Sequence, residues 1–367
     1  MDVVAANQGF GHEQVVMRHD QASGLTAIIA IHSTHLGPAA GGCRRWRYVS
    51  MEAALTDALR LSEGMSLKNA LAGIPFGGGK SVILADGRDA PSARQLAVFG
   101  GWLNELGGRY VTAEDVGMGV AAIGALSAHT EHVSGLGKHG VGGDPSPHTA
   151  HGVFLGLKAA VAHRLGATSL KGVRVAVQGL GAVGMSLCQL LDKAGAKLYV
   201  ADLDAERMRV AVNAFDATPV AAGAIALADV DVFAPCALGG VITEEVAMKL
   251  RAQVVAGAAN NQLATPAAGV CLAERGVLYA PDFVINAGGV ISVMHEYLSQ
   301  RGGFASTETD DGEHSVARWV GSRIQAIPGR MLDIVRAAEA TGESADVVAR
   351  RAAQRVMSRQ AKAEIAA

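Results

Sequence analysis

The sequence predicts an α/β protein with two domains, and three observations support this fold class. First, 367 residues, half of them hydrophobic, exceed what one ordinary core accommodates. Second, short apolar segments typical of strands alternate with segments of helical period along most of the chain. Third, residues 135–147 hold five Gly and two Pro, a composition typical of a connection between domains. We therefore predict a first domain at 1–140 and a second at 141–329, with helices at 330–367 packing back on the first.

Each domain contains recognisable elements. In the first, strands are predicted at 25–31, 81–84 and 109–112, and a helix from a Ser50 cap to about residue 64. Two glycine-dense stretches, 37–42 and 73–79, lie between these elements. In the second, helices are predicted at 149–165 and 185–193 and strands at 173–178, 198–201, 254–256 and 277–280. This second alternation favours a doubly wound parallel sheet.

The composition argues against several classes of protein. A net charge of −2 gives no bulk field that would attract nucleic acid or a membrane surface. The four cysteines form no CxxC pair, so we expect neither a metal site nor a disulfide framework, and reduced thiols are typical of a cytoplasmic protein. Residues 1–10 lack the apolar core of a signal peptide, and no apolar run reaches about 20 residues, so neither secretion nor a membrane span is predicted.

A glycine-rich turn in the second domain predicts a dinucleotide site. Its residues are Gly179, Leu180, Gly181, Ala182, Val183 and Gly184, a GxGxxG between the 173–178 strand and the 185–193 helix. Glycines permit the tight turn and let backbone approach a pyrophosphate, whose charge the helix N-terminus meets. The next strand ends at Asp202, whose carboxylate can accept hydrogen bonds from ribose hydroxyls and would repel a 2′-phosphate. We therefore predict NAD rather than NADP. Asp202 could instead cap a helix, but Asp204 is the better candidate for that role.

Three charged residues of the first domain lie in apolar or glycine-rich sequence that is unusual for solvent-facing loops: Lys68, Lys80 and Asp115. Residues 77–81, GGGKS, invite comparison with a phosphate-binding loop, but that motif needs a glycine at position 74, which is Ile. A lysine crowded against backbone and a second cation, here Lys68, can have a depressed pKa and act as a base near neutral pH. Alone, each residue is more often a solvated charge or a turn residue. Their joint setting indicates a catalytic site.

At these residues the chain resembles the Glu/Leu/Phe/Val amino-acid dehydrogenases, specifically the leucine and phenylalanine dehydrogenase branch. The matching motifs cover nearly the whole chain in the same order, at 36–42, 67–69, 74–81, 113–117, 144–150, 178–184, 233–240, 257–261 and 280–289. The resemblance implies that Lys68 binds the substrate α-carboxylate, that Lys80 is the general base activating water, and that Asp115 carries protons to and from the departing amine. The backbone of Gly41 and Gly42 would border the substrate.

The resemblance also implies roles for residues outside this group. Thr149 would contact the nicotinamide amide, Asn260 would meet the substrate or the nicotinamide ribose, and Arg44 would reach the cofactor. The first domain would bind substrate and mediate oligomerisation, so we expect a homo-oligomer. A cleft between the domains would close on the substrate and exclude water during hydride transfer.

The resemblance assigns the pocket for the substrate side chain to Ala40, Ala113, Val290 and Val293. All four are apolar, which disfavours glutamate as a substrate. The paired valines are similar to leucine dehydrogenase, whereas Ala40 stands where the family often has Leu or Met and leaves room for a longer or aromatic side chain. Leucine, valine and phenylalanine therefore stay open as substrates. We have no role to predict for His295 and Glu296.

Together these observations predict NAD-dependent oxidative deamination of a small apolar L-amino acid to its 2-oxo acid and ammonia, as a reversible reaction. Each step moves a proton, which suits a paired amine and carboxylate. Three alternatives stay open. They are phenylalanine dehydrogenase activity, a 2-hydroxy-acid dehydrogenase, which usually has a His base beside an Arg, and a non-catalytic NAD-binding regulator.

Overall fold

A computed structural model describes residues 11–137, 143–301 and 312–365, which form two compact units. The first unit comprises Met1–Pro145, Val290–Trp319 and Ala353–Ala367, and the second comprises Ser146–Gly289 and Val320–Ala352. The expectation for residues 1–10 lies outside the described residues, and so does part of the predicted connection at 135–147. Among the described helices, none combines the length and the hydropathy needed to cross a membrane.

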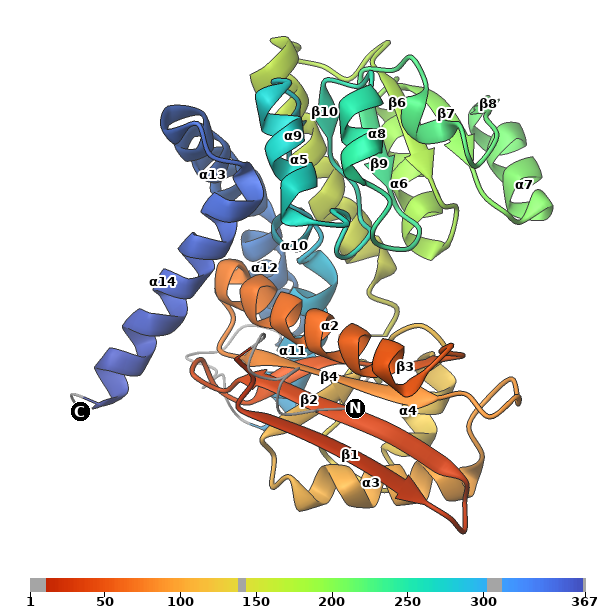
Figure 1. Cartoon of the computed structure of the whole chain (residues 1–367), viewed down its shortest axis with the longest axis vertical. Coiled ribbons are helices and arrows are strands. Elements are labelled where there is room, and N and C mark those ends of the chain that lie inside the picture. The colour runs from red at the N-terminus through yellow and green to blue at the C-terminus, as the bar shows by residue number, and fades with distance from the viewer. Residues whose placement is uncertain (1–10, 138–142, 302–311, 366–367) are drawn as a thin grey trace. The chain divides into compact units, whose positions relative to one another are not determined.

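The first unit is built on a five-stranded sheet with the order β1-β2-β4-β3-β5 (Figure 1). Its strands are β1 (Gln14–Asp20), β2 (Leu25–Ser33), β3 (Ala39–Trp46), β4 (Gly77–Leu84) and β5 (Tyr110–Ala113). β2 runs antiparallel to β1 and β4, whereas β3 runs parallel to β4 and β5. One face packs against α2 (Met51–Ala72), and the other packs against α3 (Ala93–Glu105) and α4 (Val120–Leu126). Because β3, β4 and β5 run parallel to one another, their carboxyl ends lie on the same side of the sheet.

The glycine-dense stretches are strands, contrary to the prediction that they lie between elements. Residues 39–42 open β3, and residues 77–79 open β4. Glycine is required there because the backbones approach too closely for a side chain. A Cβ on Gly41 would lie 1.9 Å from the Gly79 carbonyl oxygen, and one on Gly78 would lie 2.1 Å from the Ser66 nitrogen of α2. The glycines thus allow α2 and two strands to pack backbone against backbone.

Helix α2 begins where the sequence predicts and ends later. The Ser50 side chain accepts a hydrogen bond from the backbone N–H of Ala53, which satisfies one of the free N–H groups of the first turn. The helix continues to Ala72, and every residue from Ser66 to Ala72 is buried. It ends at Gly73, whose φ of +67° is the left-handed conformation that glycine adopts readily.

The second unit is built on a six-stranded parallel sheet with the order β11-β10-β9-β6-β7-β8. Its strands are β6 (Arg174–Gln178), β7 (Lys197–Ala201), β8 (Thr218–Pro219), β9 (Val232–Pro235), β10 (Val254–Val255) and β11 (Leu278–Tyr279). Its helices up to residue 289 include α5 (Ser146–Leu165), α6 (Ala182–Lys193), α7 (Ala205–Phe215), α8 (Glu244–Lys249), α9 (Pro266–Glu274) and α10 (Asp282–Ile285). The doubly wound parallel sheet predicted from the sequence is confirmed.

The C-terminal part of the chain is helical, as predicted. Its helices are α11 (Gly288–Gln300), α12 (Gly312–Gln325), α13 (Ile327–Thr341) and α14 (Ala345–Ile365). The sequence placed 330–367 with the first domain, whereas in the structure residues 320–352 fall in the second unit. The reason is the apolar face of α13, which carries the buried Met331 and Val335 and packs against α5 and α10.

Candidate active site

Lys80 and Asp115 form a buried ion pair on one face of the first sheet. The Lys80 Nζ atom lies 2.6 Å from Asp115 Oδ2, and the Lys80 side chain is only 6% exposed. Lys80 comes from β4, and Asp115 follows β5, which is separated from β4 by β3 alone. Lys80 and Val82 are two residues apart on β4, so their side chains lie on the same face of the sheet. Val82 packs against α2, and the Lys80 side chain therefore points to the face that α2 covers. The paired amine and carboxylate anticipated from the sequence are therefore in contact.

A second cation shares the same carboxylate oxygen. Arg44, on β3, donates from Nε to Asp115 Oδ2 at 3.1 Å and from Nη1 to Asp57 Oδ2, on α2, at 3.0 Å. The hydroxyl of Tyr48 donates to the same Asp57 oxygen at 2.5 Å. The result is one connected network, from Lys80 through Asp115, Arg44 and Asp57 to Tyr48, within the first unit.

Electrostatics keep Asp115 and Arg44 of this network ionised. Burial alone would raise the pKa of Asp115, but the charges of Lys80 and Arg44 lower it to about 2. Burial alone would lower the pKa of Arg44, but the carboxylates of Asp115 and Asp57 raise it above its ordinary value. Burial and the hydrogen bond to Asp57 raise the pKa of Tyr48, so its hydroxyl stays a neutral donor.

Lys68 occupies the buried face of α2 and is 8% exposed. It lies eleven residues after Asp57, which is close to three helical turns at about 3.6 residues per turn, so the two side chains leave the same face of the helix. That face covers the side of the sheet on which Lys80 lies. The structure thus gives Lys68 a sheltered position on the helix face that covers this side of the sheet.

The residues predicted to border the substrate in the first unit lie on β3, β5 and α11. Gly41 pairs with Thr112, and Gly42 pairs with Ala113. The Tyr110 hydroxyl donates to the Gly41 carbonyl oxygen at 2.8 Å, which fixes this stretch of backbone. Of the predicted side-chain pocket, Ala40, Ala113 and Val293 are buried and Val290 is half-buried.

The glycine-rich turn of the second unit has the geometry that a dinucleotide pyrophosphate requires. Gly179 has φ +96°, and a Cβ on Gly184 would lie 2.0 Å from the Gly179 carbonyl oxygen, so both positions need glycine for the turn and the packing. Gly181 precedes the first residue of α6, and a Cβ there would meet no atom within 4 Å. Open space at that N-terminus fits a phosphate group approaching the backbone.

Asp202 follows β7, and its carboxylate closes the same turn. Its Oδ2 atom accepts the Leu180 N–H at 2.6 Å, and its Oδ1 atom accepts the Asp204 N–H at 2.9 Å. Burial would raise the pKa of Asp202, but these backbone hydrogen bonds lower it, so the group is anionic at neutral pH. Asp204 accepts hydrogen bonds from the N–H groups of Glu206 and Arg207. The prediction that Asp204, rather than Asp202, caps the following helix is confirmed.

The remaining predicted site residues also lie in the second unit. Thr149 is in the first turn of α5. The Asn260 side-chain oxygen accepts a hydrogen bond from Asn286 Nδ2 at 3.1 Å, which orients its amide. The predicted residues therefore divide between the units: Ala40, Gly41, Gly42, Arg44, Lys68, Lys80, Ala113, Asp115, Val290 and Val293 belong to the first, and Thr149, the 179–184 turn, Asp202 and Asn260 belong to the second.

Known protein families match most of this chain. Residues 10–132 match the Glu/Leu/Phe/Val dehydrogenase dimerisation domain, and residues 198–364 match the glutamate/leucine/phenylalanine/valine dehydrogenase family. A leucine dehydrogenase of Geobacillus stearothermophilus is 48% identical over 297 residues, which are 81% of this chain and 81% of the relative. The chain belongs to the Glu/Leu/Phe/Val dehydrogenase family. It is an amino-acid dehydrogenase, an oxidoreductase, and this confirms the family, the fold class and the reaction type predicted from the sequence.

Two further relatives of this dehydrogenase span a similar share of the chain. A valine dehydrogenase of Streptomyces virginiae is 46% identical over 295 residues, which are 79% of this chain and 82% of the relative. The crystal structure of L-tryptophan dehydrogenase from Nostoc punctiforme matches with a TM-score of 0.76 at 39% identity, covering 97% of this chain and 99% of that chain.

Sequence reasoning missed three residues that shape the dehydrogenase site. Asp57 and Tyr48 fix Arg44, and no local motif marks them, because their pairing depends on how α2 lies across the sheet. Glu296 had no predicted role. Its buried carboxylate accepts the N–H groups of Gly135, Leu136 and Gly137 at 3.2, 3.0 and 3.4 Å. It thereby anchors to α11 the segment that precedes residue 138.

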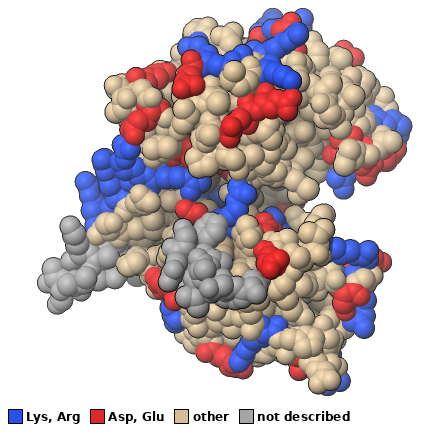
Figure 2. Space-filling view, in the orientation of Figure 1, with Lys and Arg blue, Asp and Glu red and all other residues tan. Residues whose placement is uncertain are grey.

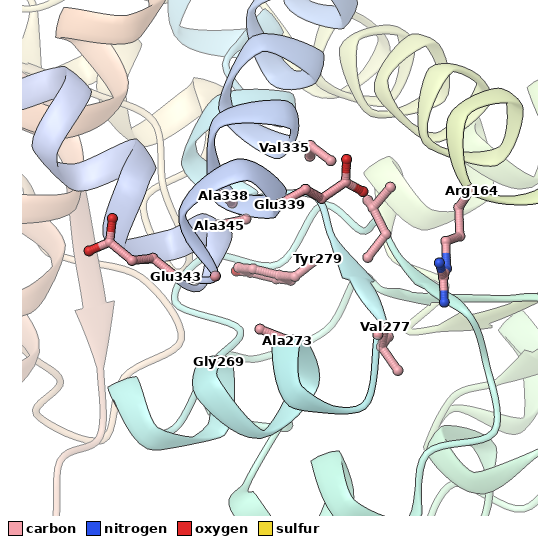
Figure 3. Close-up of a pocket in the computed structure, with 13 residues that line it drawn as sticks. Arg164, Gly269, Ala273, Val277, Tyr279, Val335, Ala338, Glu339, Glu343 and Ala345 are labelled. Carbon is pink, nitrogen blue, oxygen red and sulfur yellow. The ribbon is translucent and has the colours of Figure 1, made fainter.

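A cavity of about 270 Å³ lies away from these residues, within the second unit (Figure 3). Its wall includes Tyr279 and Val277 from the β11 region and Val335 from α13, with Arg164 at one side. Glu343, which pairs with Arg351, points away from the cavity in this view. The predicted site residues are absent from the described residues that line it.

The surface charges of the dehydrogenase are mixed. On the face shown in Figure 2, Lys and Arg gather along α14, and elsewhere they lie among Asp and Glu.

Proposed function

We propose that this dehydrogenase uses NAD to deaminate a small apolar L-amino acid, foremost leucine or valine, to the 2-oxo acid and ammonia, reversibly. The observation that carries the proposal is the buried contact of 2.6 Å between Lys80 and Asp115. An amine and a carboxylate in contact, sheltered from water, can pass protons to and from a reacting amino group. The leucine and valine dehydrogenases at 46–48% identity support the substrate class.

The proposed reaction requires bound NAD, which would supply the acceptor for the hydride of the substrate Cα. Lys68 holds the substrate carboxylate, and the backbone of Gly41 and Gly42 lines the substrate. Lys80, as the neutral amine, removes a proton from the water that attacks the substrate imine. Asp115 carries protons to and from the substrate nitrogen as ammonia departs. Asn260 orients the substrate or the ribose.

The choice of NAD rests on the second unit. Gly181 leaves room for the pyrophosphate at the N-terminus of α6, and Thr149 contacts the nicotinamide amide. The anionic Asp202 carboxylate binds the ribose hydroxyls and repels a 2′-phosphate. The resemblance to the Glu/Leu/Phe/Val dehydrogenases further implies that Arg44 reaches the cofactor.

A second substrate class is an aromatic amino acid. The observation in its favour is Ala40, whose small side chain leaves more volume than the Leu or Met often found there in the family. The L-tryptophan dehydrogenase structure, similar over nearly the full chain, supports the same alternative. A pocket lined by Ala40, Ala113, Val290 and Val293 would separate related apolar substrates by only about 10- to 200-fold.

The test is NADH formation by purified protein with leucine, valine, phenylalanine and tryptophan at alkaline pH, with kcat/KM measured for each. We expect Lys80→Ala to lower kcat by at least about 100-fold while NAD binding, measured by fluorescence titration, persists. The exposed Lys249, paired with Glu245 on α8, provides the control Lys249→Ala, which should keep full activity. Folded wild type that forms no NADH with any of the four amino acids, or full activity of Lys80→Ala, would contradict the proposal.

We further propose that the dehydrogenase is a cytoplasmic homo-oligomer. Residues 10–132 match a dimerisation domain, and this match supports self-association through the first unit.

A further inference from the structure

We propose that Arg44, whose charge Asp57 offsets in part, is the counter-charge that allows Lys80 to lose its proton beside Asp115. Arg44 is here a positioning residue, since it acts through the carboxylate it shares with Lys80. The proposal rests on the proposed function, in which Lys80 must be neutral to act as a base.

The geometry starts from a single oxygen. Asp115 Oδ2 receives both Lys80 Nζ, at 2.6 Å, and Arg44 Nε, at 3.1 Å. A carboxylate with Lys80 as its sole partner would hold the lysine proton firmly, because the neutral amine would leave a buried, unpaired anion. With Arg44 on the same oxygen, the carboxylate keeps a permanent partner when Lys80 becomes neutral, since a guanidinium stays protonated.

Asp57 is the second carboxylate that pairs with Arg44. It binds Nη1 of Arg44, while Asp115 binds Nε, so two carboxylates hold two different edges of one planar group. The Arg44 and Asp57 side chains are 16% and 29% exposed, so solvent screens this contact only in part. Tyr48 donates to Asp57 and limits its rotation. Asp57 also offsets part of the positive charge of Arg44, which gives it a measurable influence on Lys80.

Other ionisable groups near Lys80 and Asp115 lie on β3, on β5, directly after β5 and on α2. Burial raises the pKa of Cys43, on β3, to about 12, so its thiol is neutral. Burial likewise raises the pKa of Tyr110, on β5, and its hydroxyl is neutral. Burial and the charges of Asp144 and Asp115 raise the pKa of Glu114. Lys68 lies on α2, and the β2 residue opposite Lys80 is Ala30. Among the described residues, Arg44 is the second cation that hydrogen-bonds to Asp115.

The sign of the effect follows directly. At low pH Lys80 is protonated and cannot act as the base, so kcat for deamination rises with pH along an acidic limb. Removing the Arg44 charge favours the protonated lysine and moves the midpoint of this limb to higher pH. Removing the Asp57 charge leaves more positive charge near Lys80 and moves the midpoint to lower pH. Opposite shifts from two neighbouring neutralisations would not arise from a general loss of structure.

The experiment measures kcat against pH at saturating amino acid and NAD for wild type, Arg44→Gln, Asp57→Asn and the double variant. We expect Arg44→Gln to raise the midpoint by about one pH unit and Asp57→Asn to lower it by a smaller amount. In the double variant the two opposite shifts should partly cancel, so its midpoint should lie between those of the single variants.

Arg45 supplies a matched control on the same strand. Its side chain alternates to the other face of the sheet and pairs with Asp86 at 2.8 Å, so Asp86→Asn breaks a comparable ion pair without touching the network. The midpoint of the acidic limb should be the same for Asp86→Asn as for wild type. Superimposable profiles for wild type, Arg44→Gln and Asp57→Asn would overturn the inference. If Arg44→Gln does not fold, Asp57→Asn decides it alone. Absence of turnover by wild type would instead refute the proposed function.

Discussion

At the scale of single residues, Asp115 orders the proposed chemistry. Its pKa of about 2 means that it cannot receive a proton while Lys80 and Arg44 both carry their charges. Lys80 must therefore lose its proton first, after which Asp115 becomes a better acceptor for a proton from the substrate nitrogen. Lys80 Nζ and Asp115 Oδ2 are 2.6 Å apart, so a proton can pass between them without a change of rotamer.

Lys68 offers a prediction that separates binding from chemistry. We expect Lys68→Met, which keeps most of the buried side-chain volume, to raise KM for the amino acid by about 10- to 100-fold, because a charge-assisted hydrogen bond to a carboxylate is lost. The decrease in kcat should be much smaller than for Lys80→Ala. Steady-state kinetics at saturating NAD measure both parameters. An unchanged KM would show that Lys68 does not bind the substrate carboxylate.

Residues that belong to recognisable motifs could be predicted from the sequence, whereas Asp57 and Tyr48, which belong to none, could not. The caps Ser50 and Asp204 were predictable because capping depends on neighbours within a few positions. Asp57 was not, because its partner Arg44 lies on a different element and is reached only when α2 crosses β3. The network is thus a property of tertiary packing.

At the scale of elements, the glycines of β3 and β4 determine how closely α2 approaches the sheet. Hydrophobic alternation identifies strands through their side chains, so it gave no signal for residues 77–79, and the predicted strand began at 81 instead of Gly77. The same absence of side chains brings Ser66, two residues before Lys68, against Gly78. Close packing of the two backbones therefore positions Lys68, the residue predicted to bind the substrate carboxylate.

This packing predicts a large cost for a single methyl group. In Gly78→Ala the new Cβ would lie 2.1 Å from the Ser66 nitrogen and 2.6 Å from the Ser62 carbonyl oxygen, so α2 must shift. We expect the free energy of unfolding to fall by about 1–3 kcal/mol or more, measured by urea denaturation. Gly101→Ala, in α3, is the control: its Cβ would meet no atom within 4 Å, and alanine favours a helix by up to about 1 kcal/mol. Equal stabilities of Gly78→Ala and wild type would show that α2 is not held by this contact.

At the scale of the whole molecule, the two units carry separable parts of the proposed reaction. The first holds the ion-pair network and Lys68, and the second holds the glycine-rich turn and Asp202. The order of strands and helices made this division predictable. The sequence predicted a return of the C-terminal helices to the first domain, and Ala353–Ala367 belong to the first unit. The assignment of Val290–Trp319 to the first unit was not predicted, because amphipathic helices show which face is buried but not against which neighbour it packs.

The division predicts that cofactor choice can be changed without altering amino-acid recognition. Asp202→Asn removes the negative charge but keeps an oxygen that can accept the Leu180 N–H, so the turn should persist. Loss of the repulsion toward a 2′-phosphate should lower the NAD-to-NADP ratio of kcat/KM by about tenfold or more, since about 1.4 kcal/mol corresponds to tenfold. KM for the amino acid, at saturating cofactor, should stay close to that of wild type. Asp204→Asn tests specificity two residues away, because asparagine caps α7 as well as aspartate does and the ratio should not change. A ratio unaffected by Asp202→Asn, or changed equally by Asp204→Asn, would mean that Asp202 closes the turn without selecting the ribose.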